Sequence, residues 1–217
     1  MGNRAIIKGK GSDLGVYVHW NGGYDSVLAF TQYCKLKGYR SPETDSYGVA
    51  RLCQVIGNFF GGSLSVGIWN MTDKTELDEK TVDDFWLDNG VYELENWEIV
   101  SHWNPNLIKP KDEYHEGYDL MEMLLSIDES MPEKEQIKEY ICAKEIPTSE
   151  LKIGDEILII DEFYGKPTKF IIAGIGEDKV VNGRNVKGIP YISKYGNVPN
   201  ENINNYILDK TVRVVRD

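Results

Sequence analysis

A short glycine-containing segment, residues 21–26, has the residue types that can hold a phosphate group. It reads Asn-Gly-Gly-Tyr-Asp-Ser and joins an expected β-strand to an expected helix. Glycines let the backbone approach a ligand closely, and free N–H groups at the start of a helix favour an anion. The candidate anion or nucleotide loop comprises Asn21, Gly22, Gly23, Asp25 and Ser26. A glycine turn followed by a capped helix is the simpler interpretation of the same residues.

The loop also resembles the SGGxDS motif of PP-loop ATP pyrophosphatases, with Asn21 in place of the leading serine. This resemblance implies ATP-dependent chemistry. It extends over the loop alone, and the long parallel sheet of such enzymes is not expected in this chain. A nucleotide-binding enzyme, or a protein that sequesters a nucleotide signal, is therefore the alternative function.

The remaining residues with reactive side chains do not indicate an enzyme. His19 adjoins Trp20 at a strand end, and His102 and His115 lie in an expected linker with a spacing that matches no usual metal-ligand pattern. The three cysteines form no CxxC pair, and no serine has a G-x-S-x-G context. We therefore expect a binding protein with no catalytic residues, no metal site and no cofactor.

The negative charge of the chain is concentrated in its middle third. Residues 73–135 carry 19 Asp/Glu against 5 Lys/Arg, whereas residues 1–72 carry 4 against 7 and residues 136–217 carry 12 of each. A concentrated charge projects a local field, which repels nucleic acid and attracts a basic groove of the kind that holds DNA or RNA. A solvated acidic face without a partner is the competing interpretation.

Aromatic residues lie among these acids, an arrangement that is typical both of interface hot spots and of strands packing on a core. We expect Tyr92 and Trp97 to be buried and Trp86 to be at the surface. The predicted partner-binding residues are Asp73, Glu76, Asp78, Glu79, Asp83, Asp84, Trp86, Asp88, Glu93 and Glu95.

The elements that must position these residues give an α+β fold. Alternating β-rich runs predict an N-terminal hairpin, and apolar residues at helical spacing predict two helices, the first capped by Asp25 and Ser26 and the second by Ser46. The expected strands of this part are residues 4–9, 15–20, 64–69, 91–94 and 97–101. Two helices on an antiparallel sheet satisfy these signals.

Three parts are predicted along the chain. Residues 1–101 form the α+β domain, residues 102–144 a linker with short acidic helices, and residues 145–217 a β-rich domain, a small barrel or sheet. The acidic helices either pack on a domain or present the acidic face. No apolar run approaches a membrane span and the N-terminus lacks a secretory signal, so we expect a cytoplasmic protein without a membrane partner.

Several blocks of the first 101 residues together resemble a family of small proteins encoded by phages, prophages and other mobile elements of Gram-positive bacteria. The blocks are MGNRAII, GVYVHWNGGYDSV, YGVARLCQVIGNFFGGSLSVGI, DNGVY and WEIV. The resemblance implies a mobile-element accessory protein, and such proteins commonly act against host defence. An acidic insertion near residues 74–87 departs from the family pattern, and residues 102–217 lie outside the resemblance.

Charge and resemblance together predict a phage inhibitor of a bacterial nucleic-acid defence system, similar in role to anti-CRISPR proteins. Its acidic surface would occupy or flank the basic nucleic-acid channel of an RNA-guided nuclease such as Cas9, without binding nucleic acid directly. A structural protein of the phage particle is a further alternative. The C-terminal β-rich domain is expected to be an independent recognition or dimerisation unit, so a homodimer is one alternative.

Overall fold

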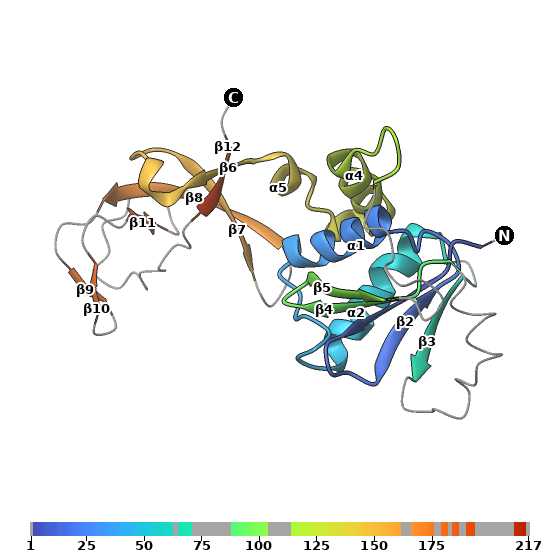
Figure 1. Cartoon of the computed structure of the whole chain (residues 1–217). Coiled ribbons are helices and arrows are strands. Elements are labelled where there is room, and N and C mark those ends of the chain that lie inside the picture. The colour runs from blue at the N-terminus through green and yellow to red at the C-terminus, as the bar shows by residue number, and fades with distance from the viewer. Residues whose placement is uncertain are drawn as a thin grey trace. The chain divides into compact units, whose positions relative to one another are not determined.

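The computed structural model describes residues 2–62, 65–70, 88–103, 114–161, 166–175, 179–181, 184–186, 190–193 and 211–215. The chain divides into two compact units, Met1–Gln136 and Ile137–Asp217 (Figure 1). The fold is mixed α+β, as predicted. Its division falls after residue 136, whereas the sequence placed boundaries after residues 101 and 144, so the first acidic helix belongs to the N-terminal unit.

The first unit is built on a five-stranded sheet in the order β3-β2-β1-β4-β5. The strands are β1 (Ala5–Gly9), β2 (Leu14–Val18), β3 (Val66–Asn70), β4 (Val91–Glu95) and β5 (Glu98–Trp103). β1 and β4 pair in parallel, with Ile6 opposite Val91, and the other pairings are antiparallel. The predicted fully antiparallel sheet is therefore wrong at this pairing. β4 enters the sheet beside β1 only after two helices and β3, so no tight hairpin imposes an antiparallel direction on this pair.

Among the described residues of this unit, three helices form a layer in which two contact the sheet and the third packs on those two. They are α1 (Tyr24–Leu36), α2 (Ser46–Phe59) and α4 (Leu120–Ser130). α2 contacts β2 and β3, α1 contacts β5, and α4 contacts both α1 and α2. The fully buried core includes Val16, Val18, Phe30, Leu52, Ile56, Leu94 and Ile127. Each such side chain stabilises the fold by about 1.5–3 kcal/mol relative to exposure.

The two N-terminal helices begin earlier than their predicted caps. Gly23 is the N-cap of α1 and makes no side-chain cap, and Asp45 is the N-cap of α2, where its carboxylate accepts hydrogen bonds from the N–H groups of Tyr47 and Gly48. The predicted caps Asp25, Ser26 and Ser46 are therefore wrong, because these residues lie inside the first helical turn. Asp25 is consequently available for contacts outside the helix.

The turn between β4 and β5 explains how Trp97 is buried. Asn96 and Trp97 have φ angles of 52° and 64°, the left-handed pair that favours tight hairpins. The Trp97 N–H donates to Ser41 Oγ at 3.0 Å, and its indole Nε1–H donates to the carbonyl of Tyr39 at 2.6 Å. Tyr92 and Trp97 are both buried, which confirms that prediction.

The second unit contains a five-stranded sheet in the order β11-β8-β7-β12-β6, together with the pair β9 and β10. Its helix is α5 (Lys138–Cys142), and its strands are β6 (Lys144–Pro147), β7 (Glu156–Asp161), β8 (Lys166–Ile175), β9 (Lys179–Val181), β10 (Arg184–Val186), β11 (Pro190–Ser193) and β12 (Thr211–Val215). Its core contains Ile146, Leu151, Ile157, Ile172, Val212 and Val214. The described strands form an open sheet, so the barrel option is not confirmed.

Short 3-10 turns complete the two units, at Glu133–Glu135 (η1) in the first and Thr148–Glu150 (η2) in the second. In the part of the chain that the structure describes, no helix has the length and apolar character needed to cross a membrane.

Candidate functional site

The glycine loop lies between β2 and α1 and is held by the N-terminal segment. Asn21 adopts a left-handed backbone with φ 55°, and the N–H of Gly22 donates to the carbonyl of Asn3 at 2.8 Å. A Cβ atom at Gly22 would lie only 2.7 Å from that carbonyl oxygen, so this close approach requires glycine. Asn21 Nδ2 also lies 3.4 Å from Ser26 Oγ.

The carboxylate of Asp25 is buried within this loop, with the residue only 3% exposed. It accepts hydrogen bonds from the N–H of Ser26 at 2.7 Å, from the N–H of His115 at 3.3 Å and from Nδ1 of the His115 ring. Burial acts to raise the pKa of Asp25, but the hydrogen bonds from the His115 side chain and from the two backbone N–H groups outweigh it, so the pKa is lowered. Asp25 is therefore held as an anion.

This anion sits in the first turn of α1, where the helix dipole favours negative charge. The site thus carries a carboxylate of its own in the region where a phosphate was predicted to bind. The predicted loop residues do lie together, but the hydrogen bonds of Asp25 and Gly22 are directed to other parts of this chain.

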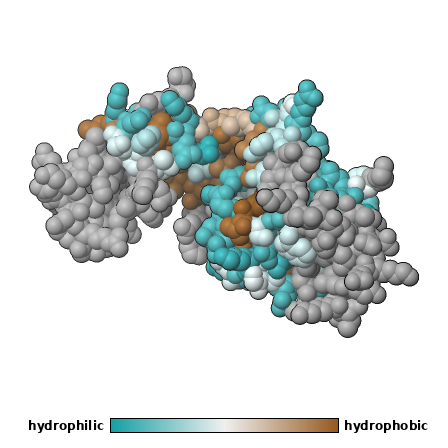
Figure 2. Space-filling model, viewed as in Figure 1, coloured by the Kyte–Doolittle hydropathy of each residue, from teal (hydrophilic) through white to brown (hydrophobic). Residues whose placement is uncertain are grey.

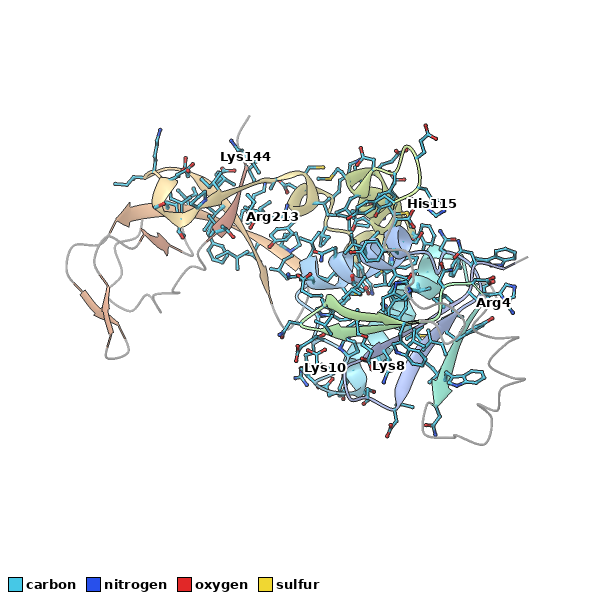
Figure 3. All side chains as sticks on the ribbon, in the orientation of Figure 1. Arg4, Lys8, Lys10, His115, Lys144 and Arg213 are labelled. Atoms are coloured by element: carbon cyan, nitrogen blue, oxygen red, sulfur yellow. The ribbon has the colours of Figure 1, made fainter. Side chains whose placement is uncertain are left out.

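The loop fastens a segment that is distant in sequence, residues 114–119, which we call the tyrosine segment. Besides the two His115 contacts, the Tyr118 hydroxyl donates to the carbonyl of Asp25 at 2.8 Å. Burial raises the pKa of Tyr118 to about 12, and the nearby Asp25 charge adds to this effect. Figure 3 labels His115 on the segment that leads into α4. This role of His115 is not predictable from the sequence, because 90 residues separate it from Asp25 and no local pattern connects them.

Aromatic rings also hold the tyrosine segment. The rings of Tyr114 and Tyr118 are stacked, with centroids 5.2 Å apart and an interplanar angle of 13°. The Tyr114 ring also meets the Tyr24 ring in an edge arrangement at 5.8 Å. Tyr114 nevertheless remains 56% exposed, so a fixed aromatic surface faces solvent beside the start of α4.

Three of the predicted acidic contact residues are paired within the chain. Asp88 Oδ2 lies 2.8 Å from Arg4 Nε, Glu93 Oε1 lies 3.0 Å from Lys8 Nζ, and Glu95 Oε1 lies 3.1 Å from Lys10 Nζ. Figure 3 labels these three cations, which lie in and beside β1. Their pairing follows from the parallel β1–β4 register, which sets Lys8 opposite Glu93. The remaining predicted contact residues, Asp73, Glu76, Asp78, Glu79, Asp83, Asp84 and Trp86, lie outside the described residues.

A second group of acids, which is not among the predicted partner-binding residues, lies on the surface without ion pairs to other described residues. These residues lie on α4 and its flanks, and we call them the α4 acidic face: Glu116, Asp119, Glu122, Glu129 and Glu133. All are exposed, and within the described ranges none forms an ion pair. Residues 114–133 contain no lysine or arginine. In Figure 2 the surface over α4 is largely hydrophilic. The helical spacing of Leu124 and Ile127, both buried, is the signal that could have placed Glu122 and Glu129 on the outer side of α4.

Other side chains with potentially reactive groups contribute to packing and hydrogen bonding within the fold. Asp128 faces inward and accepts a hydrogen bond from the buried Tyr33 hydroxyl at 2.7 Å. Burial raises the pKa of the Cys34 and Cys53 thiols, which disfavours the reactive thiolate. Among the described side chains, no group of three or more His, Cys, Asp or Glu is placed to hold a metal ion.

Comparison with known proteins gives no relative. No protein-family model matches the chain. No curated protein matches it, and no solved structure does. The α4 acidic face and the loop that fastens it are therefore the features from which a function can be inferred.

Proposed function

We propose that this protein is a mobile-element inhibitor of a bacterial nucleic-acid defence system, acting in the cytoplasm of the host cell in the manner of an anti-CRISPR protein. It binds a basic protein surface that normally holds DNA or RNA, the channel of an RNA-guided nuclease such as Cas9. Carboxylates take the places of phosphates, so the cognate nucleic acid is excluded.

The observation that supports this proposal is the contrast between two groups of acids. Asp88, Glu93 and Glu95 are compensated by neighbouring cations, which reduces their field. The α4 acidic face has no such compensation among the described residues. Uncompensated charges on one helix and its flanks give a local negative potential, which speeds encounter with a cationic groove.

The geometry also supplies the rigidity that such an interface needs. Leu124 and Ile127 anchor α4 on the helical layer, and Asp25 fastens the segment before it through His115 and Tyr118. A surface that is already ordered loses less conformational entropy on binding. The α4 acidic face is therefore preorganised on the first unit.

An inhibition assay with matched charge variants tests the proposal. Purified protein is added to a guide-loaded Cas9, and DNA cleavage is followed with and without the double variant Glu122→Gln/Glu129→Gln. The control is Asp13→Asn/Glu150→Gln, which removes the same charge at exposed positions outside residues 114–133. We expect the α4 variant to lose inhibition and the control to retain it.

Salt provides the second readout. Inhibition should weaken as ionic strength rises from about 0.1 M to about 1 M, because the Debye length shrinks from about 10 Å to about 3 Å. If Cas9 is unaffected, the partner is captured from a host lysate by affinity. Binding of the captured basic protein to wild type, to the α4 variant and to the control variant is then compared over a series of salt concentrations. Equal binding of wild type and of the α4 variant would refute the acidic-face model.

A further inference from the structure

Tyrosine rings of this chain repeatedly lie beside an arginine of the same chain. The guanidinium carbon of Arg40 lies 5.8 Å from the centre of the Tyr47 ring. The corresponding distances are 5.4 Å for Arg51 and Tyr39 and 5.0 Å for Arg213 and Tyr140. A guanidinium within about 6 Å of a ring is attracted by the negative face of the π-system.

Tyr114 is exposed and rigid, and no arginine or lysine covers it within the described part of the chain. Its ring contacts the rings of Tyr24 and Tyr118, and more than half of the residue remains accessible. A fixed ring loses little side-chain entropy when a ligand stacks on it. Tyr114 therefore has the character of an aromatic anchor for an external group.

The chemistry around Tyr114 favours a cation as that group. Glu116, two residues after Tyr114, and Glu122, in the first turn of α4, are exposed and form no ion pair among the described residues. Asp119 caps α4, because its Oδ1 accepts hydrogen bonds from the N–H groups of Met121 and Glu122. An arginine side chain is complementary to this set, since its flat guanidinium stacks on aromatic rings and donates to carboxylates.

We propose that Tyr114, together with Glu116 and Glu122, forms a docking surface for an arginine side chain presented by the partner protein. This inference rests on the proposed function and specifies the chemistry of its contact. Arginines that line a nucleic-acid channel have the required group and charge. A lysine carries the same charge but lacks the planar guanidinium, so the surface favours arginine over lysine.

Titration of the full-length chain with a nona-arginine peptide tests this contact, and a nona-lysine peptide is the charge-matched probe. We expect tighter binding of the arginine peptide. Tyr114→Ala should weaken that binding about two- to five-fold, the contribution of an exposed cation–π contact, whereas Tyr114→Phe should retain it. Tyr47→Ala is the matched control, because Tyr47 is 68% exposed and already lies beside Arg40.

Backbone amide shifts in wild-type protein give a readout that requires no substitution. Addition of nona-arginine should perturb the signals of residues 114–122 more than those around residue 47. Equal affinity for both peptides, an unchanged affinity of Tyr114→Ala, or shifts located elsewhere would each overturn the inference. The two failures are distinguishable. Loss of inhibition in Glu122→Gln/Glu129→Gln with no arginine preference would keep the acidic-face model and remove the Tyr114 contact. Unchanged inhibition in that variant would refute the acidic-face model.

Discussion

The substitution Asp25→Asn should weaken the attachment of the tyrosine segment to the glycine loop. The asparagine retains one oxygen for the Ser26 N–H, but it loses the charge and places an NH₂ group near the N–H donors of His115. A hydrogen bond to a charged group contributes about 1.5–3 kcal/mol. The His115 side chain is 70% exposed, so we assign little to the ion pair itself. We expect the free energy of unfolding of the first unit to fall by about 2 kcal/mol.

The pH dependence of stability provides a second test of this site. The pKa of Asp25 is lowered in the folded protein. Ionised Asp25 therefore stabilises the fold at pH values above its unfolded pKa of about 4, and this stabilisation is lost as the pH falls through the folded pKa. Asp25→Asn has no such group, so its stability should fall less than that of wild type between about pH 5 and about pH 2.

Tryptophan emission during urea unfolding measures both effects. The 5 tryptophans all lie in the first unit, so their signal follows that unit alone. Asp13→Asn is the control, because it makes the same charge change at an exposed position. If Asp25→Asn unfolds at the same urea concentration as Asp13→Asn, and with the same pH dependence, the contacts of Asp25 do not stabilise the unit as we infer.

Four further substitutions test contacts within each of the two units. Tyr33→Phe should lower the stability of the first unit by about 1–3 kcal/mol in urea unfolding, since it removes the donor to the buried Asp128; an unchanged midpoint would contradict this. Arg213→Ala should increase hydrogen exchange in α5, because its guanidinium donates to the carbonyls of Tyr140, Ile141 and Ala143; unchanged exchange would show that it does not hold the helix end. Gly57→Ala should raise the free energy of unfolding by about 0.5–1 kcal/mol in urea unfolding, because Gly57 lies within α2 and an added Cβ meets nothing within 4 Å. Gly22→Ala is its opposite and should be destabilising, because its Cβ would lie 2.7 Å from the carbonyl oxygen of Asn3.

Local sequence patterns located the strands and helices of the first unit, except that His102, which was placed in the expected linker, lies in β5. Apolar residues at helical spacing, such as Val27 and Phe30, identify α1, and the alternation of Tyr92 with acids identifies β4. The parallel β1–β4 pairing was not predictable, because strand direction across a long connection leaves no trace in either strand. The left-handed Trp97 was equally unexpected, since its conformation depends on contacts with Ser41 and Tyr39.

The candidate site could likewise be predicted only where it depends on neighbouring residues in the sequence. The glycine loop was recognisable from its residues, but the partner of Asp25 was not, because His115 is brought to it only by the packing of α4 on α1. Phosphate binding was predicted from the loop residues alone, without the contact between Asp25 and His115. The conformation of the loop and its glycines is equally consistent with a site that holds another segment of the same chain.

Charge counted along a sequence differs from charge presented on a surface. The first 72 residues carry an excess of cations. Three of these cations neutralise Glu93 and Glu95 of β4 and Asp88, which precedes β4. These ion pairs neutralise the negative charge of the sheet. The negative charge of α4 is not neutralised in this way, since α4 lies in a stretch without lysine or arginine. A partner that binds through complementary positive charge should therefore bind α4 more strongly than β4. Neutralising Glu122 and Glu129 should reduce binding, whereas neutralising Glu93 should expose Lys8 and mainly affect stability.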